Sequence, residues 1–97
     1  MATNFESIVT FTRPDNTVEW PFTGLATYES YVEGLLASPG LIDVNNVKTD
    51  TQSTTTFIFD SDENRQVHKT SALLLALLTE MNPIMLERGV TKTVVDL

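Results

Sequence analysis

The one histidine of the chain, His68, is the side chain best suited to proton transfer near neutral pH, because its unperturbed pKa lies there. Arg65 and Lys69 stand close to it in sequence, and their positive charges would lower its basicity. His68 also follows Val67, which begins a predicted apolar helix stripe. We therefore expect a residue at the boundary between core and solvent, with a catalytic or ligand-binding role as the alternative.

Aromatic residues gather just before and within the first predicted helix, and ligand pockets are rich in such side chains. They are Trp20, Phe22, Tyr28 and Tyr31. Aromatic side chains more often bury their apolar surface in a core or an interface, and we favour that interpretation. If a ligand site exists, we expect Trp20, Tyr28 and His68 to form it.

Carboxylates cluster in the segment Asp60-Ser61-Asp62-Glu63, and carboxylate oxygens suit calcium or magnesium. The spacing does not match a calcium loop, which needs further oxygen ligands, a central glycine and a terminal glutamate. An oxygen-bearing cap with acidic residues at the start of a helix explains the segment better. We therefore predict no metal site.

Other catalytic signatures are missing from the sequence. Its glycines are isolated from one another, so neither a phosphate-binding loop nor a dinucleotide fingerprint is present. Cysteine is absent, and the many serines and threonines lack the local contexts of an activated nucleophile. We predict no catalytic residue and no cofactor, and we favour a protein that is not an enzyme.

Composition limits the class of protein further. Ninety-seven residues suit a single α+β domain, 1–97, and an apolar share of 41% suits a globular chain. The formal charge of −7 disfavours nucleic acids and anionic membrane surfaces as partners. The longest apolar run, 72–78, is too short to span a membrane, and the amino terminus lacks a secretory pattern. We expect a cytoplasmic protein.

Alternating apolar residues predict a hairpin at the start of the chain. A period of two extends from Phe5 to Phe11, and it resumes from Val18 to Phe22 after a proline turn at 13–16. Pro21 has no amide hydrogen to donate to a neighbouring strand. The second arm should therefore be short or lie at a sheet edge.

The next elements are a helix and a second hairpin. A 3.6-residue period from Leu25 to Leu36 predicts the helix, which ends at Ser38-Pro39-Gly40 because proline cannot continue it. The two arms of the hairpin are predicted at Leu41–Thr49 and Gln52–Asp60. The apolar alternation changes phase near Asn45-Asn46, which suggests a bulge or an early end of the first arm.

The last part of the chain predicts a long helix and a closing strand. The helix opens at the acidic segment 60–63, and its apolar stripe runs from Val67 to Met81. Asn82-Pro83 either begins a new turn or kinks this helix, and Gly89 ends whatever follows. Val90–Leu97 predicts the strand.

Two segments carry the pattern of a known fold: Ser38-Pro39-Gly40-Leu41-Ile42-Asp43-Val44, a helix end followed by a strand, and Thr56-Phe57-Ile58-Phe59-Asp60-Ser61-Asp62-Glu63, a strand followed by an acidic helix start. The element order resembles the ferredoxin-like sandwich and its relatives, the dimeric α/β barrels. We therefore predict an α+β βαββαβ sandwich with an extra N-terminal hairpin strand and two helices on one sheet face.

Two functions fit this prediction. We favour a non-enzymatic homo-oligomer of structural or regulatory type that acts through its surfaces. The alternative is a small-molecule binding protein or enzyme of the monooxygenase-like dimeric α/β-barrel type, which the resemblance implies. A filled core would favour the first, and an open apolar pocket with polar groups would favour the second. The short, acidic, threonine-rich chain also resembles small proteins of bacterial viruses, whose compartment would be the host cytoplasm.

Self-association is expected because strand side chains alternate, so apolar residues must also emerge on the sheet face that the helices leave open. A symmetric dimer is the commonest outcome. The candidate interface residues are Ile8, Ile58, Val94 and Val95, and alternation requires one of the two valines to face outward.

Overall fold

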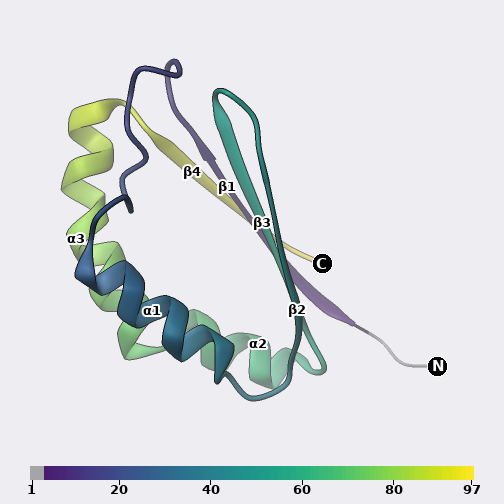
Figure 1. Ribbon diagram of the computed structural model, residues 1–97. Helices are drawn as coiled ribbons and strands as arrows, with labels where there is room; N and C mark the ends of the chain where they lie inside the picture. Colours follow the sequence, from purple (N-terminus) through teal and green to yellow (C-terminus); the bar gives the residue numbers. More distant parts are fainter. Residues whose placement is uncertain (1–3) are drawn as a thin grey trace.

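Four strands form one antiparallel sheet, and three helices cover one of its faces (Figure 1). The computed structural model describes residues 4–97. Its elements are β1 (Phe5–Thr12), α1 (Ala26–Leu36), β2 (Leu41–Lys48), β3 (Gln52–Phe59), α2 (Asp62–Lys69), α3 (Ala72–Arg88) and β4 (Thr91–Asp96). The strand order in space is β2-β3-β1-β4, so the predicted ferredoxin-like α+β sandwich is confirmed.

The predicted second arm of the first hairpin is wrong, because residues 18–22 form turns and loop instead of a strand. β3 and β4 pair with β1 along both of its edges, so no edge of β1 is free for another strand. Arg13 holds the loop instead: its Nη1 donates to the carbonyl of Val18 at 2.8 Å, and its guanidinium lies 4.2 Å from the Trp20 ring centroid.

The predicted long helix is two helices, because the chain breaks between α2 and α3 at Thr70-Ser71. The Thr70 hydroxyl donates to the Gln66 carbonyl, and Ser71 Oγ accepts from the Leu74 amide as the N-cap of α3. Such local bonds compete with helix continuity. Pro83 lies inside α3, which continues to Arg88 before Gly89 ends it in the left-handed conformation. Three helices, not two, therefore cover the sheet.

The hairpin of β2 and β3 has the predicted arms, but its irregularity lies elsewhere. The register shifts between Leu41 and Asp43, and not at Asn45-Asn46. Asn46 keeps its place facing the helices because its side-chain amide donates to Ser53 and Thr55 on β3. The change of phase in the sequence arises because Val47 faces away from the helices and is 58% exposed.

The core lies between the sheet and the helices. Its most deeply buried apolar residues are Phe59 from β3 and Leu77 and Met81 from α3. None of the helices within residues 4–97 has the length and apolar character that a bilayer crossing requires.

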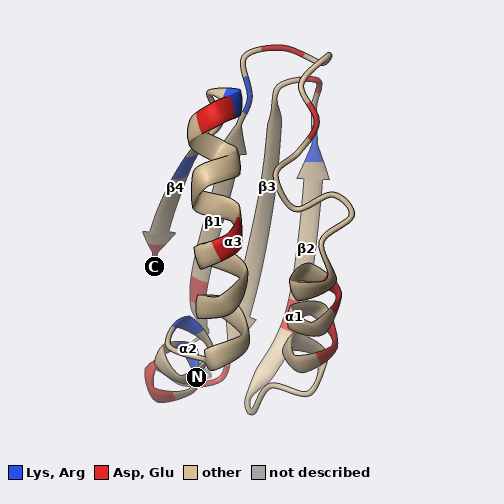
Figure 2. Cartoon of the chain, turned by 90° about the vertical axis from the view of Figure 1, so that its left-hand side faces the viewer, with Lys and Arg blue, Asp and Glu red and all other residues tan. Residues whose placement is uncertain are grey.

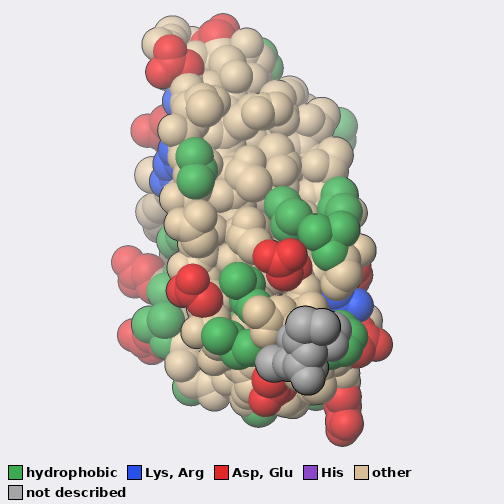
Figure 3. Space-filling model, turned by 90° about the vertical axis from the view of Figure 1, so that its right-hand side faces the viewer, with side chains coloured by type: hydrophobic (Ala, Val, Ile, Leu, Met, Phe, Trp, Pro, Cys, Tyr) green, Lys and Arg blue, Asp and Glu red, His purple; other side chains and the backbone are tan. Residues whose placement is uncertain are grey.

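The opposite face of the sheet has no helix over it, and Figure 3 shows it with small hydrophobic areas separated by other atoms. Threonine is its commonest residue, and the register places these threonines there: Thr10, Thr12, Thr54, Thr56, Thr91 and Thr93. Three of the four candidate interface residues, Ile8, Ile58 and Val95, share this face. Val94 does not, because it alternates with Val95 and lines the helix side.

Candidate functional site

A cavity of about 420 Å³ lies between the sheet and the helix layer. α1 and α3 pack on each other, and α2 is the helix whose backbone approaches β1 and β3. Figure 2 shows the view through α1 and α3 onto the sheet. The lining is mainly apolar, and its aromatic members are Phe11, Phe22, Tyr28, Tyr31 and Phe57. The space is therefore suited to an apolar molecule.

His68 lines this cavity and is only 6% exposed, so the expectation of a boundary residue is wrong. The break before α3 changes the phase of the apolar stripe on α2. His68 therefore lies on the buried face, whereas Val67 is 48% exposed. The imidazole centroid lies 4.9 Å from that of Phe57 and 5.4 Å from that of Phe59. Burial lowers the pKa of His68, and the charge of Lys69 lowers it further. Both effects favour the neutral form of the ring.

His68 is paired with Tyr31, a residue of α1 that also lines the cavity. The Tyr31 hydroxyl and His68 Nε2 are 2.7 Å apart, and both side chains are buried. Burial holds the pKa of Tyr31 well above its usual range, so the phenol keeps its proton. Within the described part of the chain, His68 Nδ1 is buried without a hydrogen-bond partner. The tautomer with its proton on Nε2 leaves Nδ1 able to accept a proton.

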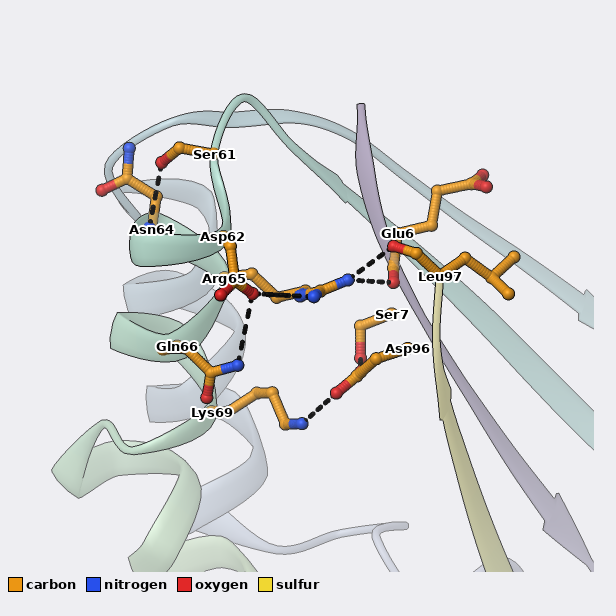
Figure 4. Close-up of polar contacts among 10 residues, drawn as sticks. All are labelled: Glu6, Ser7, Ser61, Asp62, Asn64, Arg65, Gln66, Lys69, Asp96 and Leu97. Atoms are coloured by element: carbon orange, nitrogen blue, oxygen red, sulfur yellow. Dashed lines mark hydrogen bonds and ion pairs between the residues drawn. The ribbon is translucent and has the colours of Figure 1, made fainter. Parts of the chain in front are cut away.

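Two neighbours of His68 on α2, Arg65 and Lys69, attach this helix to the strands, and Figure 4 shows their contacts. Arg65 Nη1 donates to the carbonyls of Glu6 at 3.0 Å and Leu97 at 2.7 Å, which ties α2 to the ends of β1 and β4. Lys69 pairs with Asp96, which also accepts a hydrogen bond from the Ser7 hydroxyl. Residues three and four apart share one helix face, so these contacts turn the His68 side of α2 towards the sheet.

Polar groups on the sheet also line the cavity. Asn46 Nδ2 donates to Ser53 Oγ at 3.1 Å and to Thr55 Oγ1 at 2.8 Å, so β2 and β3 present a small hydrogen-bonded cluster. The cavity thus has an apolar body and a few polar groups of fixed position, which is the usual composition of a small-molecule site.

Two of the three predicted ligand-site residues, Tyr28 and His68, line the cavity. Trp20 does not; it is buried and stacks on Phe22 with centroids 6.2 Å apart, and Phe22 reaches the cavity. Tyr31, one of the four aromatic residues that the sequence placed together as possible pocket residues, also lines the cavity. Ligand binding by these residues stays a prediction.

The acidic segment before α2 has the predicted role of a helix start. Ser61 Oγ accepts the amide of Asn64 as the N-cap, and Asp62 pairs with Arg65 at 2.7 Å. Among residues 4–97, no group of three or more histidine, aspartate or glutamate side chains is arranged to hold a metal ion.

No protein-family model matches the sequence, and no curated protein matches it. Several solved structures do match. SnoaB from Streptomyces nogalater, described as a cofactor-independent oxygenase, has a TM-score of 0.68 and 11% identity over 99% of this chain and 92% of its own. A candidate antibiotic biosynthesis monooxygenase from Nitrosomonas europaea has a TM-score of 0.72 and 13% identity, over 100% and 90%.

A further solved antibiotic biosynthesis monooxygenase has a TM-score of 0.68 and 12% identity, over 96% of this chain and 95% of its own. This chain shares their fold. The likeness shows the fold, a ferredoxin-like α+β sandwich.

The favoured prediction of a non-enzymatic structural or regulatory protein is wrong. A surface-acting protein was expected to have a filled core, whereas this core encloses an apolar cavity with a buried histidine and polar groups. The three solved structures named above are described as an oxygenase or as antibiotic biosynthesis monooxygenases. Both findings support the alternative, a small-molecule protein of the monooxygenase-like type.

Proposed function

We propose that this chain is a small-molecule enzyme of the monooxygenase-like type, in which a flat apolar substrate occupies the cavity and His68 removes a proton from it. The observation that carries the proposal is the cavity of about 420 Å³ lined by the buried His68–Tyr31 pair. Aromatic rings from the sheet, the loop and α1 provide surfaces on which a flat molecule stacks.

The source of the electrons that reduce O₂ limits the chemical class of the substrate. SnoaB is described as cofactor-independent, and an oxygenase of that kind takes the electrons that reduce O₂ from its substrate. Oxidation of an activated methylene group satisfies this balance, since the methylene and O₂ give a carbonyl and water. The reaction begins with loss of a proton from the methylene carbon, and the resulting carbanion supplies the electrons. A base that is neutral and shielded from water at pH 7 suits this step.

His68 and Tyr31 divide the work of this step. His68 Nδ1 receives the proton, because it has no competing protein partner among residues 4–97. Nε2 then donates to the Tyr31 oxygen at 2.7 Å, which stabilises the imidazolium that forms. Arg65 and Lys69 are positioning residues, because they act by holding α2 against the strands.

Oxygen uptake with anthrone tests the proposal, because anthrone is flat and its central methylene is acidic. Each anthrone oxidised should consume one O₂ and yield one anthraquinone, faster than in buffer alone. His68→Gln should lower the rate by about 10²- to 10⁴-fold, the usual contribution of a general base. Asn82→Asp, an exposed change on α3, is the control and should have no effect.

Circular dichroism of the His68→Gln protein separates loss of the base from loss of the fold. A folded His68→Gln protein that oxidises anthrone as fast as the wild type would contradict the role of His68. Binding of anthrone without turnover by the wild type would leave a binding protein and no oxygenase.

A further inference from the structure

The charges around the cavity are segregated by sign. The chain has three lysines, Lys48, Lys69 and Lys92, and all of them line the cavity. It has thirteen acidic residues, yet no aspartate or glutamate is among the lining residues. In a chain of net charge −7, the cavity therefore presents ammonium groups and no carboxylate of its own.

Two of these lysines are free of carboxylates. Lys69 is paired with Asp96, whereas Lys48 and Lys92 make no ion pair within residues 4–97. The Lys48 ammonium lies 5.6 Å from the centroid of Phe22, a ring that lines the cavity. Lys48 is exposed and Lys92 is half-buried, so both can reach the rim of the cavity without loss of hydration.

The two free lysines lie at the same level of the sheet. The register aligns Lys48 with Ser53, Ser53 with Phe11, and Phe11 with Lys92, so these residues form one row across all four strands. Figure 2 shows the basic segments of β2 and β4 at the same end of the sheet. Their Cα atoms are three strand spacings apart, roughly 14 Å. A lysine side chain reaches about 6 Å, so one anion midway between the two edge strands, above the β3–β1 pair, is within reach of both.

His68 marks the other end of the cavity. Its ring packs against Phe57, which lies four residues along β3 from Ser53. That separation is about 13 Å along an extended strand. A molecule of roughly two or three fused rings therefore spans the distance from the lysine row to His68.

We infer that the substrate is an aromatic acid whose anionic group binds Lys48 and Lys92 while its ring system extends towards His68. The aromatic body of this substrate rests on the proposed function. The anionic group is the new part of the inference. The lysines also stand on the two edge strands, where a lysine discourages association with another sheet. Edge protection requires no binding of anions, so the two roles predict different results.

A matched pair of fluorescent probes tests the inference. 8-Anilinonaphthalene-1-sulfonate carries an anion on an aromatic body, and N-phenyl-1-naphthylamine is the same body without the sulfonate. We expect the wild type to bind the anionic probe about tenfold more tightly, with the difference reduced in about 0.5 M sodium chloride because salt screens the exposed ammonium groups.

The double variant Lys48→Gln/Lys92→Gln should lose the preference for the anionic probe, while its affinity for the neutral probe stays unchanged. Asn16→Asp/Asn82→Asp is the matched control, because it changes the net charge by the same two units at exposed positions outside the cavity lining. Val94→Trp, which fills the cavity from β4, should weaken the binding of both probes.

Equal affinity of the double lysine variant and the wild type for the anionic probe would overturn the inferred anionic group of the substrate. Unchanged binding of the neutral probe in that case would leave the proposed function standing. Failure of the wild type to bind the neutral probe, or neutral-probe binding that Val94→Trp does not affect, would remove the aromatic site and this inference with it.

Discussion

At the scale of single residues, the burial of His68 couples proton binding to stability. Its pKa is lower in the folded chain than the ordinary value of 6.5, mainly because burial penalises the charged ring. The unfolded chain therefore binds the proton more readily than the folded one. Stability is complete above that ordinary value and is lost as the pH falls through it towards the folded pKa.

Urea unfolding at about pH 7.5 and about pH 5.5 measures this coupling. The wild type should lose stability over this interval, by at most about 1.4 kcal/mol per pH unit for one proton. His68→Phe should show a much smaller change, because the ring no longer titrates. The perturbed carboxylates do not interfere, since the pKa values of Asp15, Asp62 and Asp96 are lowered and these groups titrate below this interval. Equal pH dependence of the two proteins would contradict the coupling.

At the scale of elements, the turn from α1 into β2 depends on Gly40. Its φ of +71° is unfavourable for other residues, and a Cβ there would overlap Asp60 and Asn64 at the start of α2. Gly24 has a similar φ of +78° but open space around it. Gly24→Ala should therefore cost about 1 to 2 kcal/mol from backbone strain alone. Gly40→Ala should cost about 1 to 3 kcal/mol more, because its added methyl group also overlaps Asp60 and Asn64.

Chemical denaturation of the two alanine variants provides the comparison. Both substitutions remove the same glycine flexibility, so their difference isolates the close packing at the α1–β2 turn. Equal losses of stability would show that Asp60 and Asn64 move aside, and that this turn does not constrain the start of α2.

At the scale of the whole molecule, the open sheet face remains our candidate for a contact with a second copy. Ile8 and Val95 are register partners on β1 and β4, and Ile58 lies on the same face of β3. Threonines surround them and pack well on a pleated surface. We expect a dimer by light scattering at micromolar concentration, with a contact through this face.

Ile58→Glu should shift the dimer towards monomer, because it places an unpaired charge in the contact. Leu86→Glu on α3 is the matched control: Leu86 is 87% exposed and lies on the other side of the molecule, so the same charge there should leave assembly intact. A wild type that stays monomeric, or an Ile58→Glu protein that assembles normally, would exclude this contact.

Local patterns in the sequence determined most elements of this protein. Alternating residues defined β1 and the β2–β3 hairpin, and a 3.6-residue period defined α1, because each pattern reflects one element facing one core. Ser61 could be recognised as a cap from its neighbours alone. The order of these elements was sufficient to predict the ferredoxin-like sandwich, and the fold resemblance also supplied the monooxygenase-like alternative.

Only the tertiary structure decided what the site contains. The loop at 18–22 is not a strand because β3 and β4 occupy both edges of β1, which is a property of the whole sheet. Tyr31 and His68 are 37 positions apart and meet because α1 and α2 cover the same sheet face. Lys48 and Lys92 are brought to one row by strand register. The cavity itself arises from the spacing of layers, and no local sequence pattern encodes that spacing.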